Sequence, residues 1–214
     1  MFNKINVPKQ IITLLILFII LSTVRVLIFN SNYYVYLFWN IFLAVLPFII
    51  SLILLKFANN KKLTKPLLII GGIFWLLLLP NAPYIVTDLI HLNRSRGAPL
   101  IYDVFLVFSC AWTGLLLGLY SISHIEKIIR LKYKAHTTAL IIAFIILLTS
   151  FGMYLGRFLR FNSWDIFSSS SLLFTKVTEI FAKSADYREA YIFTGLSFVF
   201  LYLSYRSWKY SRAE

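Results

Sequence analysis

Leu67-Leu-Ile-Ile-Gly-Gly-Ile-Phe-Trp-Leu-Leu-Leu-Leu79 runs directly into Pro80-Asn-Ala-Pro83-Tyr-Ile-Val-Thr-Asp-Leu-Ile-His-Leu92, so an apolar segment ends in two prolines and a polar stretch. As a helix, Pro66–Leu79 would be about 21 Å long, which is shorter than the ~30 Å hydrocarbon core of a bilayer. Proline removes a backbone donor and breaks a helix. We therefore predict a membrane span broken at Pro80 and Pro83. It either kinks and continues through Val86 or forms a turn buried at membrane depth.

The rest of the chain has the composition of a membrane protein. Of its 214 residues, 60% are hydrophobic and only 14% are charged, whereas a soluble domain carries about 25% charged residues. Apolar runs long enough to cross a bilayer predict an all-α polytopic membrane protein with about six transmembrane helices in a single integral domain, residues 1–214. The predicted spans are Ile11–Phe29, Tyr36–Phe57, Pro66–Leu79 or longer, Tyr102–Ser123, Thr137–Tyr154 and Ala190–Tyr205.

The distribution of basic residues predicts the orientation. If the N-terminus is inside, the inner segments hold 13 of the 21 Lys and Arg residues, which are Lys4, Lys9, Lys56, Lys61, Lys62, Lys65, Lys127, Arg130, Lys132, Lys134, Arg206, Lys209 and Arg212. The outer segments hold 7, which are Arg94, Arg96, Arg157, Arg160, Lys176, Lys183 and Arg188. The positive-inside rule therefore places both termini in the cytoplasm.

The net charge of +13 would suggest a nucleic-acid partner in a soluble protein. Here the basic residues lie between apolar runs, so topology and anionic lipid explain them, and we expect membrane lipids and no nucleic acid as partners.

The first apolar run extends to Phe29 without a small-residue cleavage site, which is typical of an uncleaved signal-anchor. The single cysteine, Cys110, excludes a disulfide framework.

The longest outer segment predicts a short amphipathic helix on the outer surface. Leu173, Val177, Ile180 and Phe181 share one helical stripe, and the charged residues Lys176, Glu179 and Lys183 fall opposite it.

Asp88, His91 and Asp103 form the first constellation and are the candidate catalytic residues. Asp88 and His91 are three residues apart, which places them on one face of a helix. An aspartate and a histidine so placed can form an acid–base pair or share a metal, or they can simply mark a solvated helix end. Within the first span, Arg25 is expected either to extend its side chain outward or to pair with an acid.

The second constellation is Arg157, Arg160, Asn162 and Asp165, after the fifth span. Arg157 and Arg160 are again three residues apart, so we expect them to point the same way, and paired guanidinium groups suit phosphate or carboxylate. Arginine and tryptophan at a membrane interface can equally anchor a helix. Asn81 and Tyr84, in the broken span, complete the candidate substrate-binding residues.

Glycine pairs indicate close helix packing within the chain. Gly114-x-x-x-Gly118 and Gly152-x-x-x-Gly156 lie in the fourth and fifth spans, and small residues at this spacing let backbones approach.

The runs Leu79–Leu92, Tyr102-Asp103 and Gly156–Asp165 together resemble a bacterial family of membrane proteins catalogued as domain of unknown function thirteen sixty-one. The resemblance extends from about the second span to the end of the chain. It implies a bacterial multi-pass membrane protein of roughly this size, and it implies no activity, substrate or cofactor. We expect the protein in the bacterial cytoplasmic membrane.

Three functions are consistent with the sequence. In the first, the protein carries a polar site at the extracytoplasmic face that binds a lipid headgroup or phosphate, with or without catalysis. In the second, it is an envelope scaffold or assembly partner without catalysis. A transporter component is the third alternative, but no inverted repeat supports it. The sequence leaves metal and cofactor undecided.

Overall fold

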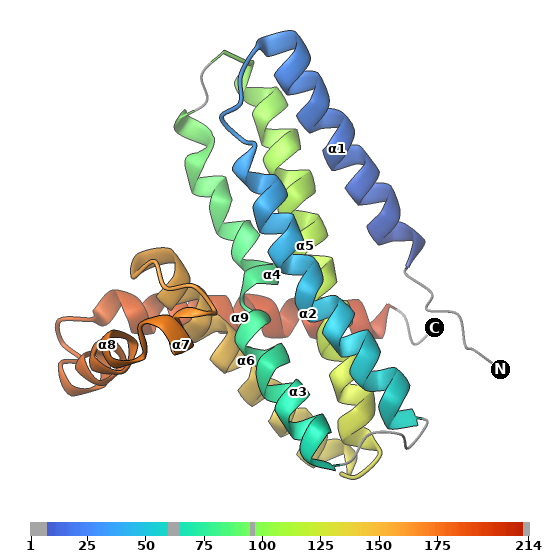
Figure 1. Cartoon of the computed structure of the whole chain (residues 1–214), viewed down its shortest axis with the longest axis vertical. Coiled ribbons are helices and arrows are strands. Elements are labelled where there is room, and N and C mark those ends of the chain that lie inside the picture. The colour runs from blue at the N-terminus through green and yellow to red at the C-terminus, as the bar shows by residue number, and fades with distance from the viewer. Residues whose placement is uncertain (1–7, 60–64, 95–96, 212–214) are drawn as a thin grey trace. The chain divides into compact units, whose positions relative to one another are not determined.

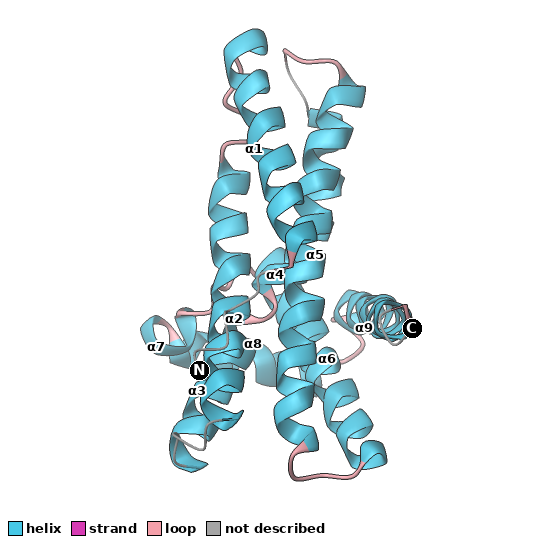
Figure 2. Cartoon of the chain, turned by 90° about the vertical axis from the view of Figure 1, so that its right-hand side faces the viewer, coloured by secondary structure: helices cyan, strands magenta, loops and turns pink. Residues whose placement is uncertain are grey.

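The computed structural model describes residues 8–59, 65–94 and 97–211, and every regular element within them is a helix (Figures 1 and 2). Five helices are long and apolar enough to cross a membrane: Lys9–Phe29, Tyr36–Ala58, Pro66–Leu92, Leu100–Arg130 and Ala135–Phe158. This confirms the predicted all-α polytopic membrane fold. Lys4, with the start of the predicted signal-anchor, lies outside the described residues.

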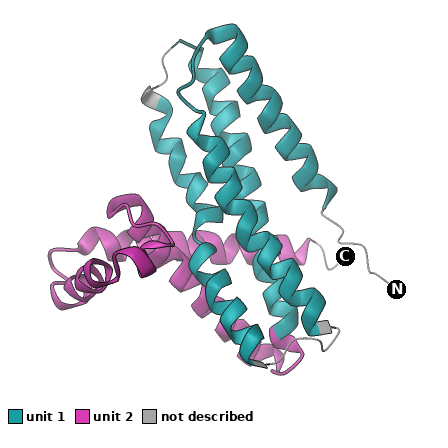
Figure 3. Cartoon of the chain, viewed as in Figure 1, with its two compact units in different colours: residues 1–128 teal, residues 129–214 magenta. Residues whose placement is uncertain are grey.

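The chain divides into two compact units, residues 1–128 and 129–214 (Figure 3). The first contains α1 (Lys9–Phe29), α2 (Tyr36–Asn59), α3 (Lys65–Leu78), α4 (Asn81–Tyr84), the 3₁₀ helix η1 (Ile85–Arg94) and nearly all of α5 (Leu100–Arg130). The second contains α6 (Ala135–Phe158), α7 (Asp165–Ser168), α8 (Ser170–Ala182) and α9 (Arg188–Tyr210).

The predicted spans correspond to helices at every position. The sixth, Ala190–Tyr205, lies within α9, which is not among the five helices apolar enough to cross a membrane because tyrosines and serines recur along it. Whether α9 crosses the membrane therefore stays a prediction.

The third span breaks at its prolines and continues as helix. α3 ends at Leu78, α4 covers the Pro-Asn-Ala-Pro turn, and η1 follows without interruption, so Pro66–Leu92 is long enough to cross a membrane. Side chains bond carbonyls along this irregular backbone: the Asn81 amide donates to Leu78 O at 3.1 Å, and the Thr87 hydroxyl donates to Tyr84 O at 2.6 Å. Buried backbone groups at membrane depth need such partners because no water supplies them.

Gly114 and Gly118 on α5 face this break. A Cβ at Gly114 would lie 2.5 Å from the carbonyl oxygen of Ala82, and one at Gly118 would lie 3.5 Å from Ala82 and Pro83. The predicted role of this glycine pair in close packing within the chain is confirmed. The Gly152–Gly156 pair stays a prediction.

Buried hydrogen bonds join α2, α3 and α5 in the first unit. The Trp75 indole, only 2% exposed, donates to Ser121 Oγ at 2.7 Å. Ser121 Oγ in turn donates to Pro47 O at 3.0 Å. Each helix therefore contributes one member to a polar contact inside an otherwise apolar core.

In the second unit, α8 packs on α6 and α9. Ile180 is 1% exposed and forms a cluster with Tyr154 and Ala190, and the Tyr191 hydroxyl donates to Ile180 O at 2.9 Å. The predicted short helix is therefore present. One member of the predicted stripe differs, because Phe181 is 64% exposed instead of sharing the buried face of Ile180.

Candidate functional site

A buried ion pair between α1 and α5 is the most strongly polar feature of the first unit. Arg25 Nε donates to Asp103 Oδ1 at 2.6 Å, and Arg25 Nη2 donates to Asp103 Oδ2 at 3.1 Å. The two side chains are 2% and 0% exposed. Of the two alternatives for Arg25, the structure therefore has the one in which it pairs with an acid. The planar guanidinium matches both carboxylate oxygens, which fixes the approach of the two helices.

The turn between α1 and α2 supplies further partners for Arg25. Asn30 adopts a left-handed conformation with φ 48°, and the chain then brings Ser31 back over the guanidinium. Arg25 Nη1 donates to Ser31 Oγ at 2.7 Å and to Ser31 O at 3.0 Å. The ring of Tyr34 lies 4.7 Å from the guanidinium carbon, a cation–π distance.

Tyr34 connects this pair to η1. Its hydroxyl donates to His91 O in a weak contact at 3.5 Å. Burial raises the pKa of Tyr34 to about 12, the Asp103 carboxylate adds to the rise and Arg25 opposes it. The hydroxyl therefore remains a donor at neutral pH.

Asp88 is held separately, by α2. Its side chain is 2% exposed, and Asn40 Nδ2 donates to its Oδ2 at 2.8 Å. Because η1 is a 3₁₀ helix with three residues per turn, Asp88 and His91 lie nearly above one another, as their spacing predicted. His91 is half-buried.

The two aspartates predicted to act in catalysis thus each bond to a side chain from another helix. Asp103 accepts from α1 and Asp88 accepts from α2. Within the described residues, no group of three or more His, Cys, Asp and Glu side chains is placed to hold a metal ion. These bonds hold α1 against α5 and α2 against η1. A catalytic role for the two acids stays a prediction.

Asn81 and Tyr84 lie in the broken span, on α4. Both are half-buried, and the Asn81 amide bonds the end of α3 as described above. Their predicted role in substrate binding also stays a prediction.

The Arg157–Asp165 segment belongs to the second unit. Arg157 is half-buried on the last turn of α6, which ends at Phe158, while Arg160 is exposed beyond the helix with φ 58°. The expectation that the two arginines point the same way rested on helical spacing. That spacing does not apply, because the chain leaves the helix between them.

Asp165 organises the turn that follows. The Asn162 backbone N–H donates to its Oδ2 at 2.6 Å, and the Ser168 hydroxyl donates to its Oδ1 at 2.9 Å. The backbone bond from Asn162, followed by the bond from Ser168, holds the pKa of Asp165 below its ordinary value. The Asp165 carboxylate therefore stays ionised, and both of its oxygens accept hydrogen bonds within its own turn.

The candidate residues are divided between the two units. Asn81, Tyr84, Asp88, His91 and Asp103 belong to the first, whereas Arg157, Arg160, Asn162 and Asp165 belong to the second. A common site for both groups stays a prediction. Sequence reasoning missed Ser31 and Tyr34 as partners of the buried charges. An asparagine inside an apolar span indicates a buried hydrogen-bonded group, which Asn40 is, but its pairing with Asp88 was not predicted.

These features define a multi-pass, all-α membrane protein with buried polar pairs between its helices. The family model for proteins of unknown function called DUF1361 matches residues 39–204. The chain therefore belongs to this family. No curated protein and no solved structure matches the chain.

Proposed function

We propose that this protein binds a phosphate group, as an anionic lipid headgroup or as free phosphate, at the extracytoplasmic face of a bacterial cytoplasmic membrane. Arg160 is the principal ligand and Arg157 assists it. The observation that carries the proposal is the exposure of Arg160 beside a carboxylate, Asp165, whose oxygens are already bonded by Asn162 and Ser168. The nearest acid in sequence is thus committed elsewhere, and Arg160 makes no hydrogen bond or ion pair with the described residues.

The surroundings of Arg160 support a headgroup as the source of the phosphate. It follows the last turn of α6, a helix apolar enough to cross a membrane, and the aromatic residues Phe158 and Trp164 nearby are 46% and 44% exposed. Exposed aromatic residues at the end of a span are typical of the headgroup region. A guanidinium at this depth can donate two parallel hydrogen bonds to phosphate oxygens.

The test compares Arg160→Gln with the intact protein in nanodiscs that contain phosphatidylglycerol or only phosphatidylcholine, with inorganic phosphate added in a second arm. Native mass spectrometry measures the retained anionic lipid. Losing one charge-assisted pair should weaken phosphatidylglycerol retention by about tenfold. Competition by millimolar inorganic phosphate would identify free phosphate as the ligand, and its absence would identify the lipid.

Lys183→Gln is the matched control, because Lys183 is exposed in the same unit and the substitution removes the same charge. If Lys183→Gln weakened retention as much as Arg160→Gln, the effect would come from net charge and the proposed site would be wrong.

A second candidate, an envelope scaffold, is favoured by a different observation. The buried contacts Arg25–Asp103 and Asn40–Asp88 use the acids that catalysis would need. If Asn substitutions at Asp88 and Asp103 lowered the amount of folded protein in proportion to any loss of function, the scaffold would be supported over an enzyme. The transporter alternative gains no comparable support from the described residues.

A further inference from the structure

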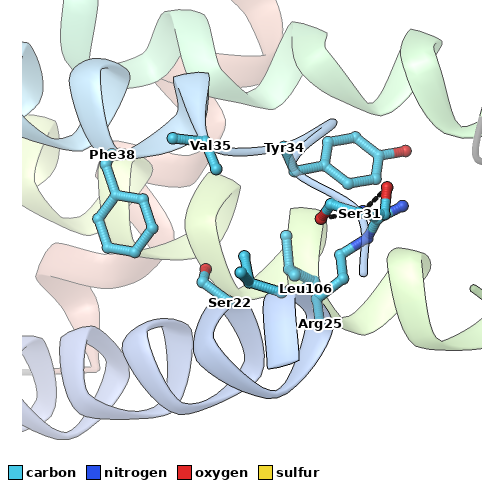
Figure 4. A pocket seen from close by; sticks show the side chains of 8 residues that line it. Ser22, Arg25, Ser31, Tyr34, Val35, Phe38 and Leu106 are labelled. Atoms are coloured by element: carbon cyan, nitrogen blue, oxygen red, sulfur yellow. Dashed lines mark hydrogen bonds between the residues drawn. The ribbon is translucent and has the colours of Figure 1, made fainter. Parts of the chain in front are cut away.

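A small cavity of about 10 Å³, enough for about one water molecule, lies beside the buried Arg25, between α1, the start of α2 and α5 (Figure 4). Phe38 and Leu106 contribute to its apolar wall, and Ser22, Arg25 and Ser31 contribute polar atoms. The cavity therefore has both apolar and polar walls. It lies next to the charge of Arg25, in a part of the chain that we expect to lie in the membrane.

Ser22 provides the first indication of an occupant. The residue is only 6% exposed, and its Oγ has no hydrogen-bond partner among the described residues. The buried helical hydroxyls of Ser51, Ser109 and Ser150 donate to carbonyls of their own helices, as Ser150 Oγ does to Ile146 O at 2.9 Å. A buried hydroxyl left without a partner is costly, so Ser22 Oγ points to a guest with hydrogen-bonding capacity.

Ser31 and Arg25 offer the guest further partners. Ser31 Oγ accepts from Arg25 Nη1, and its own proton goes to no described residue. Arg25 makes four hydrogen bonds, to Asp103 and Ser31, of the five that a guanidinium can donate. The Ser22 and Ser31 hydroxyls lie on the cavity side of their chain segments (Figure 4).

The charges around the cavity select the chemical class of the guest. The Arg25–Asp103 pair has no net charge, so nothing beside the cavity specifically attracts a cation or an anion. A lipid alkyl chain would match the apolar wall but would leave Ser22 Oγ unsatisfied. Only a small molecule that is uncharged and can hydrogen-bond Ser22 Oγ suits this cavity. A buried water fits this description and commonly makes two to four hydrogen bonds.

We propose that this cavity is a water-binding site, in which one water molecule bonds Ser22 Oγ and bridges it to the Ser31–Arg25 side of the buried ion pair. The water completes the hydrogen bonding of α1 where no protein group reaches. This inference concerns the first unit and does not depend on phosphate binding by Arg160.

Two measurements on the full chain in bilayers test the site. Ser22→Ala removes one oxygen and adds no volume. If water bonds Ser22, the substitution removes a hydrogen bond and should raise the unfolding equilibrium constant by about fivefold. If Ser22 Oγ is truly without a partner, the substitution removes a desolvated polar group, and stability should stay unchanged or rise.

Water-edited solid-state NMR provides the second measurement. Magnetisation should pass from water protons to the Ser22 and Ser31 side chains. The matched negative control is Ser150, which is 0% exposed and bonded to its own helix. Unchanged or increased stability of Ser22→Ala would overturn the proposal, and so would transfer to Ser22 from lipid acyl protons in place of water.

Discussion

At the residue scale, Arg25 and Asp103 account for the two charges buried most deeply in the first unit. A charge in a span is tolerated when it is paired and its remaining donors are satisfied. Asp103 on α5 and Ser31 in the turn between α1 and α2 accept four of the five hydrogen bonds that Arg25 can donate, and the Tyr34 ring of the same turn lies over the guanidinium. The pair joins residues 78 positions apart, so it fixes α1 against α5.

Asp103→Asn should strongly destabilise the protein, because it removes one charge and leaves Arg25 buried without its counter-ion. We expect the free energy of unfolding to fall by about 3–5 kcal/mol. Chemical unfolding in mixed micelles measures this change.

Asp186→Asn is the control, since Asp186 is exposed and should tolerate the change. The double variant Arg25→Met, Asp103→Leu should recover much of the lost stability. A stable Asp103→Asn protein that had lost its cellular function would instead favour the predicted catalytic role of Asp103.

At the scale of elements, the broken third span is the feature that the sequence predicted most directly. The prolines alone predicted the break, yet they did not decide between a kinked continuous helix and a turn at membrane depth. The close approach of α4 to Gly114 and the side-chain bonds of Asn81 and Thr87 stabilise the continuous form. Those contacts depend on helices that are not adjacent in sequence.

Gly114→Ala should disrupt the packing of α4 on α5, because its Cβ would lie 2.5 Å from Ala82 O, a backbone atom that cannot move independently. The expected loss is about 1–3 kcal/mol of unfolding free energy. Thermal unfolding in detergent measures it.

Gly72→Ala serves as the matched control, since a Cβ there meets nothing within 4 Å. Alanine is the better helix former, so this variant should be neutral or more stable by up to about 1 kcal/mol. Equal effects at the two glycines would contradict close packing at Gly114.

At the scale of the whole molecule, the number of membrane crossings depends on α9. Five helices qualify by length and composition, and α9 would be the sixth. Its 23 residues would extend about 35 Å, which is enough for a ~30 Å core. Arg206 and Lys209 near its end agree with a cytoplasmic C-terminus under the positive-inside rule.

Single-cysteine labelling decides the topology. In a chain with Cys110 replaced by alanine, cysteines at Lys132, Asp186 and Ser211 provide three exposed reporters. If α6 and α9 both cross the membrane, an impermeant maleimide added outside should label position 186 and spare positions 132 and 211. Labelling of 211 together with 186 would show that α9 does not cross.

The sequence by itself determined the class of protein, the positions of the helices and the break at Pro80. These properties follow from local composition, since apolar runs, prolines and basic loops affect the structure of the segment in which they occur. It also predicted polar residues worth examining, because charges in apolar runs are costly wherever they occur.

Only the tertiary structure decided what those polar residues contact. Asp103 belongs with Arg25, Asp88 belongs with Asn40, and Arg160 lies outside the helix that was expected to align it with Arg157. Hydrogen bonds between helices depend on how the helices pack, and residue spacing within one helix does not contain that information. For the same reason, the cavity beside Ser22 has no counterpart in the sequence pattern.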